Sequence, residues 1–450
     1  MLCTLISSKP TIDISKIKSV DHYPYTLPLP EWAKCANIYE VNIRQYTPEG
    51  TFDAFRMHLP RLSLMGVDIL WFMPVFPISE TKKKGTLGSY YAVSDFRATN
   101  PNFGTMLSFQ NVIDEAHSLG MKVILDWVPN HTGWDHIWIH HHPDYYTKDS
   151  SGHITDPIND HGASMGWQDV ADLNYGNHDM REAMVNDMIY WLKEHHIDGF
   201  RHDMALLVPL DFWRSAIQKL RCVKDDLFML AESEVAEHTN QHCFHAIYGW
   251  SLHHILNDVA QGKKNVSAID HWFDHDYPKI SFGQYMHFTS NHDENSWSGS
   301  EIERMGEAHR AFAALVITLD GIPLMYSGQE EPMAKRLEFF EKDDIGFKNF
   351  AYADFYTALH HIKHDNKALW NANYGGKVER VWRHDHIFAF TRQRDENTIF
   401  VVINLSNQKQ QITLDKDIGG IELFSGRAVD FRNGSVMSLM PWEFFIFNIA

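Results

Sequence analysis

The stretch VDILWFMPV, residues 67–75, decides the fold class that this sequence predicts. It is apolar from Ile69 onward, with no polar residue at alternate positions. A strand with one solvated face alternates apolar and polar residues, whereas a strand of a parallel sheet is covered on both faces and is apolar throughout. Parallel strands also need long crossover connections, which are usually helices. The stretch therefore predicts an α/β protein in which similar strands are separated by helices.

Strand-like and helix-like segments alternate on both sides of this stretch. The seven other strand-like segments are residues 36–43, 121–129, 197–203, 227–233, 243–250, 284–293 and 322–328. Helical spacing is found at residues 51–66, 106–120, 179–196, 209–221 and 309–321. Eight strands with intervening helices predict a (β/α)8 barrel, the TIM-barrel fold.

Two regions do not follow this alternation. Residues 130–176 are rich in His, Asp, Gly and Trp without clean periodicity, and they are too long for an ordinary loop. After about residue 370, the sequence alternates apolar and polar residues, which is typical of antiparallel strands. The predicted domains are an N-terminal extension (1–35), the barrel (36–126 and 177–370), an inserted domain (127–176) and a C-terminal antiparallel β-sandwich (371–450).

Charge and composition exclude some classes of partner. The formal net charge of −18 does not fit a nucleic-acid-binding protein, which is expected to carry a basic stripe. The basic run Lys82-Lys83-Lys84 is interpreted as a solvated loop. No stretch approaches the roughly 20 apolar residues of a membrane span, and the N-terminal residues lack the basic start of a signal peptide. We therefore expect a cytoplasmic protein that binds neither nucleic acid nor membrane.

Charged and polar residues stand where several of the predicted strands end. Arg201 and Asp203 are two positions apart on one strand, so their side chains point to the same face. In a TIM barrel the C-terminal strand ends form one mouth, which carries the active site. Alone, Arg201 and Asp203 would equally suit a structural ion pair, but residues from four strands converge, which favours a site. The candidates at this mouth are Asp126, Asn130, His131, Arg201, Asp203, Glu232, Asn291, His292 and Asp293.

Three of these residues are carboxylates from different strands. Two carboxylates on either side of a bond are what glycoside hydrolysis uses, one as the acid and one as the nucleophile or base. A neighbouring Arg201 would keep Asp203 ionised. Glu232 follows the apolar run FMLA, and burial there would favour its protonated form, as an acid requires.

These segments resemble motifs of the α-amylase family, glycoside hydrolase family 13. The four main motifs are DWVPNH (126–131), GFRHD (199–203), LAES (230–233) and SNHD (290–293). Four secondary segments also match, at residues 66–77, 89–96, 171–177 and 321–330. All eight occur in the family's order between residues 36 and 450, which makes the resemblance specific.

The resemblance implies a role for each matching residue. Asp203 is similar to the family's nucleophile, Glu232 to its general acid/base, and Asp293 to its third, sugar-binding carboxylate. The implied substrate-binding or bracing residues are Tyr91, Asp126, Asn130, His131, Arg201 and His292. The implied reaction is a double displacement with retention at α-glucosidic bonds of an α-1,4-glucan or malto-oligosaccharide. Retention predicts the Asp203 and Glu232 carboxyls about 5–5.5 Å apart.

Several alternatives stay open at this point. Glu234 competes with Glu232 as the acid, and Tyr90 competes with Tyr91; the motif spacing favours Glu232 and Tyr91. An α-glucosidase or an α-glucan transglycosylase would use the same motifs. A non-catalytic glucan-binding protein would be expected to lack one of the three carboxylates.

A metal site has little support in the sequence. Many α-amylases have Lys-His where this chain has Leu206-Leu207, and that histidine contributes to a structural calcium site, although Asn130 is retained. The resemblance thus implies no required cofactor and makes structural calcium doubtful. His136 and His140 are four residues apart but lack an HExxH motif, so we expect surface or loop histidines. Because the inserted segment is short, we expect an open substrate cleft.

Overall fold

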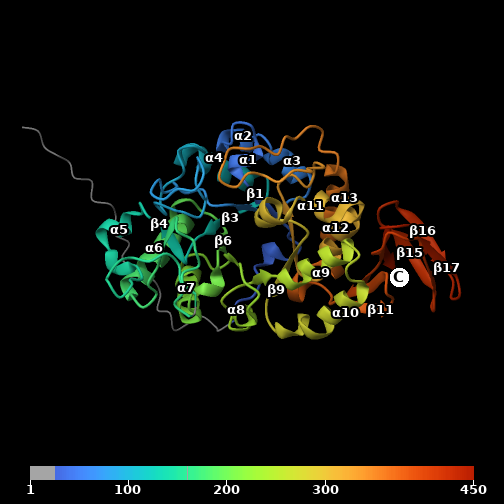
Figure 1. Ribbon diagram of the computed structural model, residues 1–450. Helices are drawn as coiled ribbons and strands as arrows, with labels where there is room; N and C mark the ends of the chain where they lie inside the picture. The colour runs from blue at the N-terminus through green and yellow to red at the C-terminus, as the bar shows by residue number, and fades with distance from the viewer. Residues whose placement is uncertain (1–25, 160, 450) are drawn as a thin grey trace, which may run out of the picture.

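The computed structural model describes residues 26–159 and 161–449 of the chain. Eight parallel strands form a closed barrel in the order β1-β10-β9-β8-β7-β6-β3-β2 (Figure 1). The predicted α/β barrel is confirmed, with one strand inside each predicted segment. The strands are β1 Ile38–Val41, β2 Ile69–Phe72, β3 Lys122–Trp127, β6 Gly199–His202, β7 Phe228–Ala231, β8 Ala246–Tyr248, β9 Gln284–Phe288 and β10 Ile322–Tyr326.

The two faces of these strands explain why β2 is apolar throughout. Ile69 and Trp71 pack with residues of other strands in one buried cluster, which fills the inside of the barrel. Leu70 and Phe72 belong to a second cluster, which packs against the helices. Both faces are therefore covered, and neither can carry polar side chains without cost.

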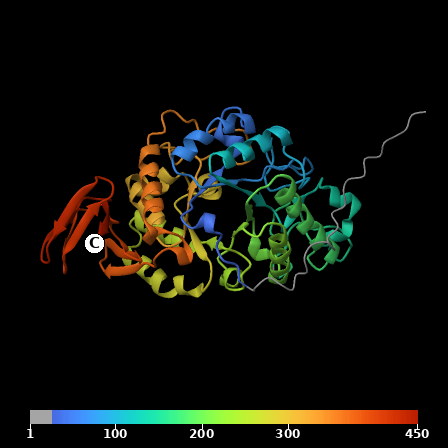
Figure 2. The same ribbon diagram turned by 180° about the vertical axis from the view of Figure 1, so that it is seen from behind.

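Helices surround the barrel (Figure 2). The helical pattern at 51–66 forms two short helices, because Pro60 lies in the first turn of the second one and cannot continue the first. The helices of the barrel are α1 Ile43–Tyr46, α2 Phe52–Arg56, α3 Leu59–Leu64, α4 Met106–Ser118, α6 His178–Glu194, α7 Leu210–Val223, α8 Ala236–Asn240, α9 Trp250–Ala260, α10 Val266–His275, α11 Glu301–Met305, α12 His309–Thr318 and α13 Ala353–Asp365.

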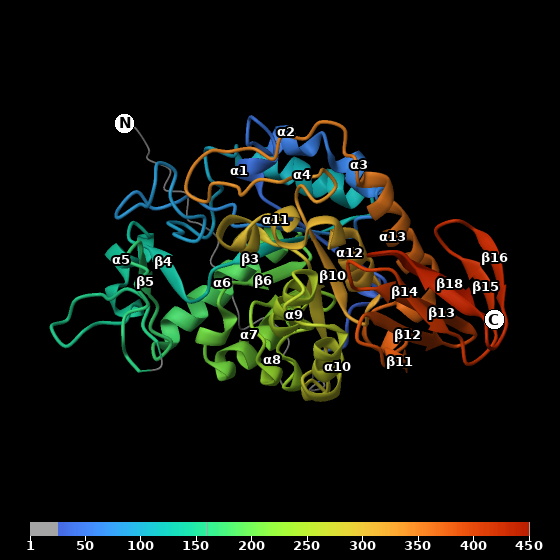
Figure 3. The same ribbon diagram turned by 45° about the vertical axis from the view of Figure 1, so that its right-hand side comes forward.

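The inserted segment and the C-terminal region lie on opposite sides of the barrel (Figures 1 and 3). In the inserted segment, β4 His131–Gly133 pairs with β5 Val170–Asp172, and α5 Ile137–His141 lies between them in sequence. The C-terminal region is antiparallel, as expected, but the second sheet of the sandwich has only the two strands β14 Gln410–Thr413 and β17 Val436–Leu439. The six-stranded sheet contains β11 Glu379–Trp382, β12 Ile387–Arg394, β13 Asn397–Asn404, β18 Phe444–Ile449, β15 Ile418–Glu422 and β16 Arg427–Phe431.

The structure bears on the expected location of the protein only in part. No helix within residues 26–159 or 161–449 has both the length and the apolar character needed to cross a bilayer. The segment on which the signal-peptide expectation was based, and most of the predicted N-terminal extension, lie outside the described residues.

Candidate active site

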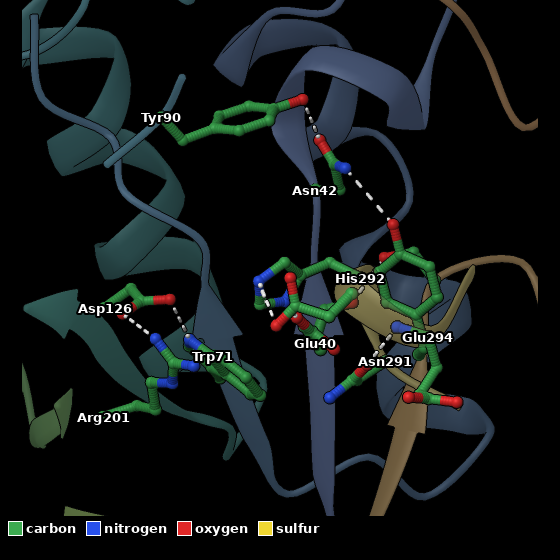
Figure 4. A network of polar contacts seen from close by, with 12 residues as sticks. Glu40, Asn42, Trp71, Tyr90, Asp126, Arg201, Asn291, His292 and Glu294 are labelled. Atoms are coloured by element: carbon green, nitrogen blue, oxygen red, sulfur yellow. Dashed lines mark hydrogen bonds and ion pairs between the residues drawn. The ribbon is translucent and has the colours of Figure 1, made fainter. Parts of the chain in front are cut away.

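Arg201 is the centre of the polar residues at the barrel mouth. Its side chain is fully buried, and Nη1 donates to Asp126 Oδ1 at 2.8 Å and to Asp203 Oδ1 at 3.1 Å. Nη2 forms an ion pair with Glu232 Oε2 at 3.0 Å, and Nε donates to the Tyr248 hydroxyl at 3.0 Å. One guanidinium thus holds carboxylates on or directly after β3, β6 and β7, which is why a charged pair occupies an otherwise apolar strand. Figure 4 shows the contact of Arg201 with Asp126.

A cavity of about 220 Å³ opens above this cluster. Asp126 and Arg201 lie beneath it, and Asn130 contacts His131 Nδ1 at 3.3 Å without lining it. A larger groove of about 810 Å³ lies between the α9–α10 connection and the C-terminal domain, but no carboxylate lines it. The cavity at the mouth is therefore the candidate active site. Six of the nine predicted site residues line it: Tyr91, His131, Asp203, Glu232, His292 and Asp293.

The structure separates the two tyrosines that the sequence left in competition. The Tyr91 hydroxyl donates to Asp126 Oδ2 at 3.1 Å and lies 2.8 Å from His292 Nε2. The Tyr90 hydroxyl instead donates to Asn42 at 3.0 Å, outside the cavity. Tyr91 is therefore the tyrosine that lines the cavity and contacts Asp126 and His292, as the motif spacing favoured.

The two glutamates are separated in the same way. Glu232 Oε2 accepts the backbone N–H of Met204 at 2.8 Å and lines the cavity. Glu234 does not line it, because its carboxylate accepts from the backbone N–H and the hydroxyl of Ser251. Only Glu232 is placed to act on a bound ligand.

Burial changes the expected charge of the cluster. Burial and the neighbouring Glu232 carboxylate raise the pKa of Asp203 well above its ordinary value, and Arg201 only partly opposes this. Burial likewise raises the pKa of Asp126 to about 6 in spite of Arg201. The expected effect of Arg201 on the pKa of Asp203 is present, but desolvation of a buried carboxylate outweighs one neighbouring cation.

Glu40 on β1 also contacts this site, although it is not among the site residues predicted from the sequence. This residue is fully buried, and its Oε1 lies 2.5 Å from His292 Nδ1 (Figure 4). Burial lowers the pKa of His292, but the carboxylates of Asp293 and Glu40 raise it more, to about 9. His292 is therefore an imidazolium at neutral pH, donating to Glu40 on one side and to Tyr91 on the other. Glu40 is the only charged residue of segment 36–43, and that was the available signal.

The Lys82-Lys83-Lys84 run lies in a loop, with Lys82 exposed and the Lys84 side chain 42% exposed, but these two lysines also contact the inserted segment. The Lys82 amine lies 3.4 Å from the centre of the Trp134 ring. Lys84 forms a 2.6 Å ion pair with the buried Asp169, and both residues line the cavity. Lys83 alone pairs locally, with Glu80. The run gave no signal of this, because the partners lie about 50 or more residues further along the chain.

Among the described residues, no group of three or more His, Cys, Asp or Glu side chains could hold a metal. The expectation about structural calcium near Asn130 stays a prediction. His136 lies in a loop, where it is buried against Phe96, and His140 is exposed, so both agree with the expected surface or loop positions.

Two family models match this chain. The model for the alpha-amylase catalytic domain matches residues 33–367, which span the barrel and the inserted segment. The model for the maltogenic amylase C-terminal domain matches residues 380–446.

Individual proteins with known names are also similar. The chain is 26% identical over 415 residues to alpha-amylase MalA of Haloarcula japonica, which covers 88% of this chain but only 59% of that protein. The solved structure of a maltogenic alpha-amylase from Thermotoga neapolitana matches with a TM-score of 0.81 at 25% identity, covering 93% of this chain and 100% of that one. An alpha-amylase from Lactobacillus plantarum matches with a TM-score of 0.81 at 27% identity, covering 92% and 99% of the two chains.

Proposed function

This chain belongs to the alpha-amylase family and is an amylase-type glycoside hydrolase, and we propose that it cleaves α-1,4-glucans or malto-oligosaccharides with Asp203, Glu232 and Asp293 as its catalytic carboxylates. The observation that carries the assignment of residues is the shared guanidinium of Arg201. Two groups that act on the same bond must face the same cavity, and Arg201 holds Asp203 and Glu232 in this way. The separation of about 5–5.5 Å stays a prediction.

The proposed reaction has two displacements. An ionised Asp203 oxygen attacks the anomeric carbon, while the protonated Glu232 gives its proton to the departing glycosidic oxygen. This leaves a glucosyl ester on Asp203 and an ionised Glu232. Glu232 then takes a proton from water, whose oxygen attacks the same carbon and frees Asp203.

The remaining residues would bind the sugar ring as positive charge develops on it. His292, held as an imidazolium, and His131 line the cavity and would donate to ring hydroxyls. Asp293 would accept from hydroxyls of the same ring. Phe339 and Trp167 supply apolar walls of the cavity, which suit the apolar faces of a glucose unit.

The names of the relatives support the class of substrate. They include an alpha-amylase of Haloarcula japonica and a maltogenic alpha-amylase of Thermotoga neapolitana. Product analysis tests the proposal: glucose or malto-oligosaccharides should appear from starch and from maltoheptaose, with each new reducing end released first as the α-anomer in proton NMR. Wild-type inactivity on every α-glucan, or release of the β-anomer, would contradict it.

Two variants test the catalytic assignment. Asp203→Asn and Glu232→Gln should each lower kcat/KM at least about a thousandfold, because each removes a group that forms or receives a bond to the reacting atoms. Glu234→Gln is the matched control from the same segment, and it should keep most of the wild-type activity. Full activity in Asp203→Asn would end the proposed mechanism.

We propose that no cofactor is required. The three carboxylates and two histidines of the cavity supply every proton transfer and every charge in the steps above. Activity should survive exhaustive dialysis against EDTA. Loss of activity that added calcium restores would show that a metal site is needed.

A further inference from the structure

Residues 79–89, between β2 and α4, form a segment that we call the strap. At its start, the strap is attached to the inserted segment. The Asp135 carboxylate accepts the backbone N–H groups of Glu80 and Thr81 at 2.7 and 2.8 Å and the Ser79 hydroxyl at 3.0 Å. Three hydrogen bonds to one carboxylate fix this end of the strap against the inserted segment.

The middle of the strap is tied across the cavity wall. The ion pair of 2.6 Å between Lys84 and Asp169 joins the strap to the inserted segment at a second point. Both residues line the cavity, and so does Ser89 at the end of the strap. The wall on this side is therefore continuous from the inserted segment into the strap.

The far end of the strap is attached to the loop between β10 and α13. The backbone N–H of Leu87 donates to Phe340 O at 3.0 Å. Arg44, which is buried in α1 directly after β1, donates to the carbonyls of Leu87 at 3.2 Å, Gly88 at 3.0 Å and Phe339 at 3.0 Å. The strap thus passes over the rim of β1 and β2, and the loop that follows β10 also runs over α1 and α2 (Figure 3).

The barrel order shows which end of a substrate this wall would meet. β7, whose last residue Ala231 precedes Glu232, is four places from β1 and three from β2 in the closed ring of eight strands, so the acid stands across the mouth from the rim that carries the strap. The acid protonates the oxygen of the leaving group, so the reducing part of the chain departs on the β7 side. In an α-1,4-linked glucose unit, the anomeric carbon and the C4 oxygen are at opposite ends of the ring. The C4 oxygen therefore points toward the strap.

The size of the cavity agrees with a closed end. About 220 Å³ is below the roughly 300–1,000 Å³ of pockets that enclose drug-sized ligands, so it suits a single sugar ring better than a run of several. On this side the wall is formed by Lys84 and Ser89 of the strap together with Trp167 and Asp169 of the inserted segment.

We propose that the strap closes the non-reducing side of the cavity, so that the enzyme acts on the non-reducing ends of α-glucans, with the Lys84–Asp169 ion pair contacting the terminal hydroxyl groups. This inference rests on the proposed function. Lys84 keeps a side chain that is 42% exposed, which leaves N–H donors for a ligand beside the donor used by Asp169. A chain that continued beyond the bound ring would have to pass through the strap.

End-capped substrates test the inference on the wild-type enzyme. Two samples of maltoheptaose with a fluorophore at the reducing end are compared, one of them carrying an ethylidene acetal on its non-reducing glucose. The uncapped substrate should be cleaved, and the capped one at least about a hundredfold more slowly, because the cap occupies the position of the closed wall. Equal rates would overturn the inference and leave the proposed function intact. No cleavage of either would overturn the proposed function itself.

A matched pair of lysine variants tests the strap directly. Lys84→Ala removes the ion pair at the wall and should raise the rate on the capped substrate, relative to the uncapped one, at least about tenfold. Lys83→Ala is the control, because Lys83 pairs with Glu80 and does not line the cavity. An unchanged ratio in Lys84→Ala, with a melting temperature equal to that of the wild type, would remove Lys84–Asp169 from the end-recognition site.

Discussion

Buried carboxylates and cations at the barrel mouth are arranged so that each carboxylate faces a positive charge. Arg201 neutralises the cluster on the side of β3, β6 and β7, and His292 does so on the side of β1 and β9. Glu40 is the residue behind His292: one of its oxygens contacts the imidazole, and the other has no hydrogen-bond partner among the described residues. The charge state of His292 therefore depends strongly on Glu40.

Replacing Glu40 should change the pH dependence of the reaction. A glutamine in Glu40→Gln keeps the shape but removes one of the two negative charges, those of Asp293 and Glu40, that together raise the pKa of His292 to about 9. The group is protonated below its pKa, so the alkaline limb of kcat/KM should move to lower pH, by at least about one pH unit. The measurement is the pH profile of the variant on maltoheptaose.

Glu234→Gln is the control variant for the Glu40 prediction. Glu234→Gln removes a carboxylate that contacts Ser251 and should leave the alkaline limb in place. If Glu40→Gln lowered activity equally at every pH, Glu40 would have only a structural role.

Contacts at the N-terminal end of the barrel, opposite the mouth that carries the candidate site, fix the position of β6. Asp198 stands directly before β6 and accepts the Val123 N–H at 2.9 Å and His117 Nε2 at 2.7 Å. Gly199 follows, with φ of 154°, and a Cβ there would lie 1.9 Å from Phe228 O. The glycine of the GFRHD motif is therefore required by the close approach of β6 to β7 and not by the chemistry.

Asp198→Asn should destabilise the barrel in a pH-dependent way. Although burial opposes it, hydrogen bonds from His117 and Val123 lower the pKa of Asp198 below its ordinary value of 3.8. A lowered folded-state pKa contributes stability that is present above 3.8 and is lost as the pH falls through the folded pKa. Urea unfolding should show a loss of about 3–5 kcal/mol at pH 7 that shrinks toward about pH 3. A loss that did not depend on pH would contradict this.

In the whole molecule, the buried Arg392 is one of several contacts that join the C-terminal domain to the barrel, among them the 2.5 Å ion pair between Arg380 of β11 and Asp270 of α10. Arg392 on β12 donates to five backbone carbonyls, two at the C-terminal end of α12 and three in the segment between α13 and β11. These carbonyls belong to Thr318, Leu319, Leu369, Trp370 and Gly376, at distances between 2.6 and 3.2 Å. Burial lowers the pKa of Arg392 to about 10, so the cation is held almost entirely by carbonyl dipoles.

Arg392→Met should lower stability without changing the chemistry. It removes a donor from five backbone carbonyls, of which only that of Leu369 still accepts from Lys363 Nζ, and we expect a loss of at least about 3 kcal/mol in the free energy of unfolding. Arg394→Met, at an exposed position of the same strand, should stay within about 0.5 kcal/mol of the wild type. Thermal unfolding measures the difference, and kcat at 25 °C should be unchanged in both. A melting temperature of Arg392→Met equal to that of the wild type would show that other contacts hold the two domains together.

The sequence by itself determined the barrel, the position of every barrel strand and the side chains at their ends. These are local properties: two-sided burial makes β2 apolar, and the side-chain period of two places Arg201 and Asp203 on one face. The four main motifs then supplied the family, because their order along the chain needs no structure.

Only the tertiary structure decided how these side chains are paired and charged. Glu40 contacts a histidine 252 positions away, and Tyr91 was separated from Tyr90 by that same histidine, 201 positions away. The raised pKa of Asp203 comes from its burial, and the role of Lys84 comes from Asp169 on another segment. Desolvation and Coulomb energies depend on distances in space, which a linear spacing does not contain.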